Sequence, residues 1–280
     1  MPLPLITGRG WRGGALAAGP AAPAGASGYD LDDDHNIDTT PFIHWDASTL
    51  VSVNSASDGS TFSTWTSREG SDYDLVQADA AEQFTYEATS SNMNSKPVAI
   101  SSDGARHMMT ATDFLPAGTV TMPVTIIMAV YALSGAPTYQ SHFGGKNVSG
   151  DNVNSFKPYS PRVGKWNIYM NNGSHMMGDT YTAGAQVVAW ELNPSGTTYN
   201  FVNLARTTIS STISTNNPFN YQFSLGAGNT GANDVVTNTE IAEVIIYNEI
   251  LSGTEMSGSN VSGGELHTII TYLKTKYGIS

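Results

Sequence analysis

The acidic segment 30–38 has carboxylates at the spacing of a calcium-binding loop. In such loops oxygen ligands occupy alternate positions, a glycine makes the turn and a glutamate closes the site. Here His35 and Pro41 stand where that glycine and glutamate would be. The sequence therefore favours a solvated acidic linker and predicts no cofactor, with calcium left open. The candidate metal ligands are Asp30, Asp32 and Asp34.

The carboxylates Glu240 and Glu243, which lie three positions apart, are considered as a catalytic pair for glycan hydrolysis. That reaction uses two carboxyl groups on one side of a cleft. On an unbroken strand, side chains three positions apart point to opposite faces. The spacing therefore argues against an enzyme, and the sequence also lacks the common serine-hydrolase, zinc-protease and phosphate-loop motifs.

A repeated tripeptide, His-Met-Met, occurs at residues 107–109 and 175–177. Imidazole and thioether groups together can bind a soft metal such as copper. Methionine in a strand more commonly fills a core, because its flexible side chain adapts to irregular gaps. We favour the packing interpretation.

Aromatic side chains near turns could stack on sugar rings. Tryptophan and tyrosine present a large apolar face together with a polar tip, although most of them serve the core. Three that lie near turn-rich segments are the candidates for carbohydrate binding: Tyr159, Trp166 and Tyr181.

Composition and charge exclude some classes of partner. The formal net charge is −12, and only Arg9 and Arg12 are charged in residues 1–28, so the rest of the chain is more acidic still. Such a surface repels phosphate backbones, which argues against nucleic-acid binding. The absence of cysteine excludes disulfides and thiol chemistry. No apolar run reaches the roughly 20 residues that cross a bilayer, so no membrane insertion is expected.

Residues 1–28 are rich in glycine, alanine and proline and cannot form a core of their own. A secretory signal fits the basic start and the small residues near position 25, but prolines and glycines interrupt its apolar part. An extended arm that binds a neighbouring subunit is the favoured alternative. Its predicted contact residues are Leu5, Arg9, Trp11 and Arg12.

From residue 41 onward, short alternating segments separated by turn residues predict many strands. The longest, residues 120–133, is apolar on both faces, which indicates a central strand between two layers. Near the end, apolar residues from Leu266 to Tyr277 recur at helical spacing. Ser262 and Glu265 suggest a capping box and Gly278 a C-terminal cap. These elements predict a β-sandwich with one helix on its rim.

Several segments in chain order resemble the concanavalin A-like and laminin G-like jelly rolls of bacterial surface proteins and phage virion proteins. The opening strand departs from the family in having His44 where an apolar residue is usual. The segments that carry the resemblance are 42–48 (Phe-Ile-His-Trp-Asp-Ala-Ser), 63–65 (Ser-Thr-Trp), 102–109 (Ser-Asp-Gly-Ala-Arg-His-Met-Met), 124–130, 223–227 and 241–247.

The resemblance implies an all-β, two-sheet antiparallel jelly-roll sandwich over residues 41–280, preceded by an extended arm and acidic linker over residues 1–40. It leads us to expect a non-enzymatic bacteriophage virion protein, a capsid decoration, head fibre or tail-side attachment protein located in the virion. Its partners would be other virion proteins or copies of itself, bound through residues 1–28. The alternative is a carbohydrate-binding lectin or adhesin on a virion or bacterial surface, or secreted, with a host-surface glycan as partner. A secreted glycan-cleaving enzyme is the third hypothesis.

Overall fold

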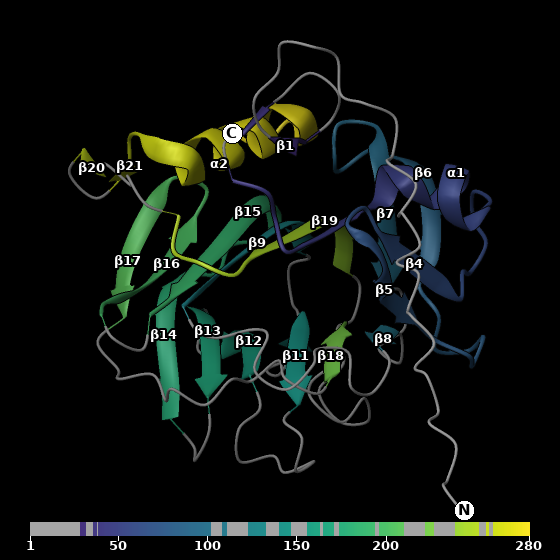
Figure 1. Cartoon of the computed structure of the whole chain (residues 1–280), viewed down its shortest axis with the longest axis horizontal. Coiled ribbons are helices and arrows are strands. Elements are labelled where there is room, and N and C mark those ends of the chain that lie inside the picture. Colours follow the sequence, from purple (N-terminus) through teal and green to yellow (C-terminus); the bar gives the residue numbers. More distant parts are fainter. Residues whose placement is uncertain are drawn as a thin grey trace, which may run out of the picture.

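A computed structural model gives the fold of the chain (Figure 1). It describes residues 29–31, 36–37, 39–101, 108–110, 123–132, 140–146, 156–162, 165–170, 174–193, 196–209, 222–226, 239–251, 256–257 and 260–280. Strands dominate these residues, which confirms the predicted all-β sandwich. None of the described helices has the length and apolar character needed to cross a membrane.

A large antiparallel sheet forms the middle layer of the molecule. Its strands follow the order β20-β21-β17-β16-β15-β9-β19-β7-β6, and β3 also pairs with β19. The bounds are β20 Met256–Ser257, β21 Asn260–Val261, β17 Ala205–Ile209, β16 Thr198–Val202, β15 Gly184–Leu192, β9 Val124–Ala132, β19 Thr239–Tyr247, β7 Lys96–Ser101, β6 Thr85–Ser90 and β3 Ile43–Asp46.

Two smaller sheets form the second layer, below the large sheet in Figure 1. One has the order β11-β18-β8-β5-β4 and the other β10-β12-β13-β14. The first contains β11 Phe143–Lys146, β18 Gln222–Leu225, β8 Met108–Thr110, β5 Gly70–Val76 and β4 Thr64–Ser67. The second contains β10 Gln140–Ser141, β12 Phe156–Arg162, β13 Lys165–Met170 and β14 Ser174–Thr180.

Strand β9 is the predicted central strand. It pairs along its length with β15 on one side and with β19 on the other. Its even-numbered residues from Val124 to Val130 face the second layer, while Ile127 and Ala129 face the opposite side. A strand that is apolar on both faces must be covered on both, and this one is.

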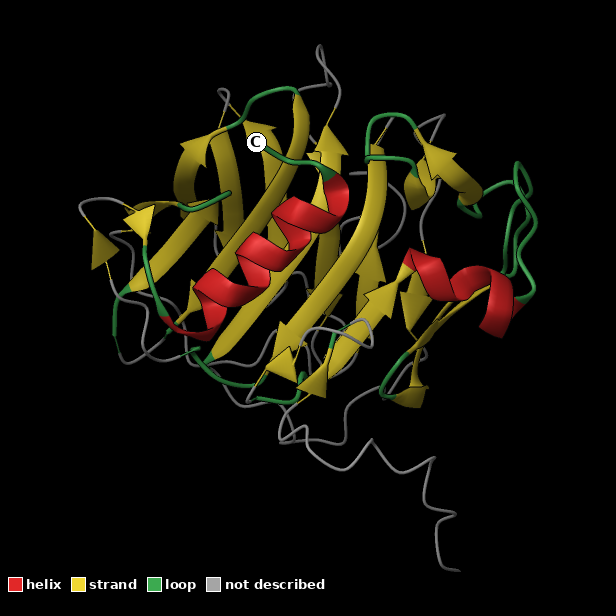
Figure 2. Ribbon diagram, turned by 90° about the horizontal axis from the view of Figure 1, so that it is seen from above, coloured by secondary structure: helices red, strands yellow, loops and turns green. Residues whose placement is uncertain are grey.

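The side of the large sheet that faces away from the second layer is covered by helix α2, Gly264–Tyr277 (Figure 2). The apolar side of the helix packs against the sheet through Leu266, Ile269, Ile270 and Leu273. The helix is therefore confirmed, but it crosses the face of the sandwich instead of lying on its rim. Gly278 ends it in the left-handed conformation, with φ 65°, as predicted.

The predicted capping box at the start of α2 is wrong. The N-cap is Gly263, which has no capping side chain. Glu265 instead accepts hydrogen bonds from Thr39, through the backbone N at 2.6 Å and through Oγ1 at 2.5 Å. Thr39 therefore satisfies the Glu265 carboxylate and joins the helix to the segment that leads into β3.

The segment before β3 also packs on the domain. Strands β1 Tyr29–Asp30 and β2 Asn36–Ile37 form a small ribbon, and Leu31 is fully buried in the core under α2. The expectation of a solvated acidic linker over residues 30–38 does not agree with the burial of Leu31. Apolar contact with α2 holds part of that segment against the sandwich.

A short helical segment follows β3 at the other end of the molecule. It consists of the 3-10 turn η1 Ala47–Thr49 and helix α1 Leu50–Asn54. Asp46 caps η1, since its Oδ1 accepts from Ser48 N at 2.8 Å. Leu50 is buried, whereas Val51 and Val53 are exposed.

Candidate functional site

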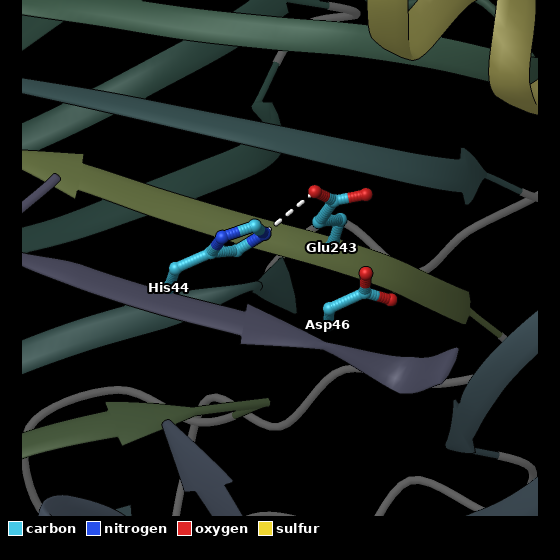
Figure 3. Close-up of side chains that lie close together, drawn as sticks. All are labelled: His44, Asp46 and Glu243. Atoms are coloured by element: carbon cyan, nitrogen blue, oxygen red, sulfur yellow. Dashed lines mark hydrogen bonds and ion pairs between the residues drawn. The ribbon is translucent and has the colours of Figure 1, made fainter. Parts of the chain in front are cut away.

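A cluster of charged and polar side chains lies between the large sheet and the last turn of α2. His44 and Asp46 come from β3, Glu243 comes from β19, and Lys276 and Tyr277 come from α2. Figure 3 shows the first three side chains converging between their strands. His44, Asp46, Glu243 and Tyr277 are buried, whereas the Lys276 side chain is partly buried, at 11% exposed.

Strand periodicity brings these side chains to one face. In β3, Ile43 and Trp45 point into the core between the layers, so His44 and Asp46 point toward α2. In β19, a bulge between Ile241 and Glu243 adds one residue opposite β9. Glu243 then pairs with Asp46 on the side of the helix.

The same bulge corrects the expectation that Glu240 and Glu243 lie on opposite faces. Glu240 is opposite Tyr131 and Glu243 is opposite Ala129, both of which face α2. An interrupted strand no longer follows the two-residue period on which the expectation rested. The two carboxylates are nevertheless separately bound, because Glu240 accepts from Asn92 Nδ2 at 2.6 Å and from Ser90 Oγ.

Every oxygen of Glu243 has a partner. His44 Nε2 donates to Oε1 at 2.6 Å, since an ionised carboxylate can only accept. Lys276 Nζ lies 2.8 Å from Oε2, and Tyr277 Oη donates to the same oxygen at 2.7 Å. Burial alone raises the pKa of Glu243, but the Lys276 charge and the His44 hydrogen bond outweigh it and lower the pKa to about 2.

Lys276 binds both carboxylates of the cluster. Its Nζ is 3.0 Å from Asp46 Oδ2, in addition to the contact with Glu243. Burial lowers the pKa of Lys276, and the two carboxylates raise it by more, so the net shift is upward. His44, Asp46 and Glu243 have ligand atoms within 4.8 Å of one another, as in a metal site. The ammonium already compensates their charge, so the arrangement is an ion-pair cluster that fastens α2 to β3 and β19.

A second feature is a polar groove beside α1, called here the α1 groove. It has a volume of about 510 Å³ and lies between the end of α1, the turn that follows it and the start of β4. This volume suits a small ligand. Its polar lining residues are Asn54, Ser55, Ser60, Thr61, Ser63, Thr64 and Gln83, and its apolar lining residues are Val53, Ala56 and Phe62.

Backbone and side-chain hydrogen bonds hold the shape of the α1 groove. Asn54 Nδ2 donates to Thr66 Oγ1 at 2.9 Å and Asn54 Oδ1 accepts from Thr66 N at 3.2 Å, which joins α1 to β4. Phe62 N donates to Phe84 O at 3.2 Å and Gln77 N to Ser63 O at 2.9 Å. Gln83, another lining residue, is 7% exposed and donates through Nε2 to Gln77 O at 2.8 Å. The groove is therefore preformed.

The carbohydrate-binding candidates from the sequence do not come together at this groove. Trp166 is 1% exposed, and its Nε1 donates to Gln186 Oε1 at 2.9 Å. Its ring packs on Trp190 and Tyr181 inside the sandwich. The expectation that Trp166 stacks on a sugar is wrong, because solvent does not reach the ring. Tyr181 is half-buried against Trp166, with ring centroids 5.2 Å apart.

The remaining predicted site residues stay untested. Tyr159 lies on β12 and Asp30 on β1, and only their backbone is described. The two His-Met-Met repeats lie on strands of different sheets, β8 and β14, with His107 outside the described residues. Also outside the described residues are Leu5, Arg9, Trp11, Arg12, Asp32 and Asp34.

Sequence reasoning missed both features. The alternation of apolar and polar residues in β3 was one available signal, and His44 in an otherwise apolar pattern was another. Lys276 and Tyr277 gave no signal of their own, since a basic residue and a tyrosine are ordinary at the end of a helix. The α1 groove depends on how a turn folds back, which hydrophobic periodicity does not encode.

No protein-family model and no curated protein matches the sequence. Solved structures do match the fold. Domain 4 of AbnA, an extracellular arabinanase from Geobacillus stearothermophilus, in complex with arabinotriose, has a TM-score of 0.54 at 10% identity and covers 85% of this chain and 98% of its own. Trypanosoma rangeli sialidase in complex with sialic acid has a TM-score of 0.53 at 9% identity over 83% of this chain. That match spans about a third of the sialidase, 32% of its chain.

These matches correct the function expected from the sequence. The hypothesis of a non-enzymatic bacteriophage virion protein is wrong, because the fold is shared with an arabinanase domain and a sialidase. The virion location and virion partners lose their support with it. At this level of identity the matches establish a β-sandwich fold that this chain has in common with both proteins.

Proposed function

We propose that this chain is a carbohydrate-binding β-sandwich domain without catalytic activity of its own. The observation that carries the proposal is the match to an arabinanase domain that was solved with arabinotriose bound and is covered almost completely, at 98%. Fold alone does not determine function, so the proposal also needs a place on this chain where a sugar could bind. The α1 groove, preformed and lined by hydroxyl and amide groups, is such a place.

We propose that the domain is not catalytic because the carboxylates that face α2 are already bound by other side chains. Hydrolysis of a glycosidic bond requires one carboxyl group to donate a proton and another to attack or activate water, both in contact with the substrate. Glu243 is 0% exposed and accepts from three donors. Glu240 is bound by Ser90 and Asn92. Neither carboxylate is arranged for chemistry on a bound sugar.

The proposal also covers the structural family of the domain and the place where it acts. The concanavalin A-like and laminin G-like resemblance of residues 42–48 and 241–247 agrees with a sandwich in which these two segments pair as β3 and β19. A carbohydrate-binding domain of this kind would act at a bacterial surface or after secretion, where glycans are available. Residues 1–28 remain a predicted attachment arm.

The test is a binding and activity measurement on the full chain. We expect an array of neutral and acidic oligosaccharides to reveal specific binding, confirmed by calorimetry. Chromatography of the same oligosaccharides after long incubation should show no shortened products. An array without a specific signal would overturn carbohydrate binding, and release of shortened products would overturn the non-catalytic assignment.

A further inference from the structure

We propose that the α1 groove is the sugar-binding site and that it takes an uncharged oligosaccharide, rejecting sugars that carry a carboxylate. This inference rests on the proposed carbohydrate-binding function and adds the location of the site and the chemical class of its ligand. The two solved structures described above were bound to sugars of both classes, the neutral arabinotriose and the acidic sialic acid. The residues that line the α1 groove, and the charge around it, distinguish between neutral and acidic sugars.

The hydroxyl groups of the groove are available to a ligand. Ser55, Thr61 and Ser63 are exposed along its wall, and Thr64 is half-buried beside them. Within the described part of the chain, none of these four hydroxyls has a hydrogen-bond partner, unlike Ser60 and Asn54, whose side chains bond Ser57 and Thr66. Hydroxyls both donate and accept, so they match the hydroxyls of a sugar in either direction.

Apolar side chains supply a smaller part of the lining of the α1 groove. Phe62 and Ala56 are 5% and 8% exposed, and Val53, at 55%, forms an open wall on α1. Phe62 is fixed in place by Trp65 and Phe84, whose ring centroids lie 6.0 and 6.5 Å away. Lining residues that are already held in place reduce the ordering that binding requires.

Charge decides against a carboxylated sugar. Neither lysine nor arginine lines the groove. Residues 41–101, which contain the whole groove, hold eight carboxylates against two basic residues, Arg68 and Lys96, for a formal charge of −6. Arg68 faces away toward Asp46 and the Leu31 carbonyl. A ligand carboxylate would therefore lose hydration and meet repulsion with no cation to pair with it.

The experiment compares ligands and variants on the full chain by calorimetry. The neutral probes are arabinotriose, xylotriose, cellotriose and maltotriose, and the acidic probe is sialyllactose. The groove variant is Thr61→Val with Ser63→Ala, which removes two hydroxyls at nearly constant shape. The matched control is Thr208→Val with Thr271→Val, which removes two exposed hydroxyls far from the groove on β17 and α2.

We expect at least one neutral probe to bind at least tenfold more tightly than sialyllactose. The groove variant should weaken that binding at least about tenfold, since each lost hydrogen bond removes part of the affinity, and the control should leave it unchanged. Equal or tighter binding of sialyllactose would overturn the ligand class. Neutral binding that the groove variant does not weaken would overturn the location and leave the proposed function standing. Failure of every probe would overturn this site and its ligand class, and the oligosaccharide array described above would decide separately whether the chain binds carbohydrate at all.

Discussion

Lys276 Nζ lies 2.8 Å from Glu243 Oε2 and 3.0 Å from Asp46 Oδ2, so one ammonium in the last turn of α2 is shared by carboxylates of two strands. Glu243 is 0% and Asp46 2% exposed. Removing one partner of a buried ion pair leaves an uncompensated charge, which is far more costly than the loss of a surface pair.

We therefore expect Lys276→Met to lower the free energy of unfolding by about 3–5 kcal/mol. Denaturant unfolding followed by circular dichroism measures the change. Lys274→Met is the matched control, because Lys274 lies on the same turn and contacts neither carboxylate in the described structure. Equal effects of the two variants would show that the cluster does not stabilise the helix.

Acid should weaken the domain through Glu243. The pKa of Glu243 is about 2 in the folded chain and near 4.5 when unfolded. A lowered carboxyl pKa stabilises the fold above the unfolded value, and this stabilisation is lost as the pH falls from about 4.5 toward 2. Unfolding free energies measured across this range should decline less steeply in Glu243→Gln. A variant slope as steep as that of the parent would refute the assignment.

A rise in pH should lower the stability of the domain through the carboxyl group of Glu191. Burial raises the pKa of Glu191 to about 7, against a smaller lowering by Arg206, and Oε1 of Glu191 accepts no hydrogen bond from the described residues. A raised carboxyl pKa stabilises the fold below the unfolded value, near 4.5, and this stabilisation is lost as the pH rises toward 7.

Glu191→Gln should thus gain stability relative to the parent between pH 5 and pH 8, by an amount on the order of 1–3 kcal/mol. The comparison with the parent is essential, because burial also lowers the pKa of His142 to about 4. His142 destabilises the fold as the pH falls below about 6.5 and is common to both proteins. A difference between the two proteins that does not change with pH would contradict the prediction.

Gly178 should tolerate no side chain. An added Cβ would lie 2.6 Å from Trp166 O and would also overlap the side chain of Asn200, which bonds Asp179 N at 2.8 Å. This is where strand β14 of the smaller sheet approaches β16 of the large one. Gly178→Ala should destabilise the fold by about 1–3 kcal/mol.

A double-mutant cycle tests the cause. In an Asn200→Ala background the added methyl has more room on one side, so the cost of Gly178→Ala should fall. Additive effects of the two substitutions would assign the cost to the backbone of β13 alone.

The layers of this fold could be predicted from sequence, whereas its polar features could not. The two-sided apolar pattern of β9 and the helical stripe of α2 are local signals, and both elements formed where they were expected. The bulge before Glu243 changes which face a side chain occupies without any mark in the residues Ile241 and Ala242. The burial of Trp166 likewise depends on the packing of distant strands.

The candidate sugar-binding site could not be predicted from the sequence either. The sequence indicated aromatic platforms near turns, and the structure places one of them, Trp166, inside the core. The α1 groove is built from small hydroxyl residues that are common in any turn. Hydrogen bonds between distant residues, such as those between Asn54 and Thr66 and from Gln77 N to Ser63 O, hold those residues around a shared groove.

The pairing of β3 with β19 also has a kinetic consequence. His44 and Glu243 are 199 positions apart, and the ammonium that binds Glu243 comes 33 positions later still. A ribosome must therefore synthesise the 199 positions from His44 to Glu243 before β3 can pair with β19. Until then the apolar residues of β3 are exposed and prone to aggregation. Refolding in vitro should also be slow, as for other proteins dominated by contacts between distant segments.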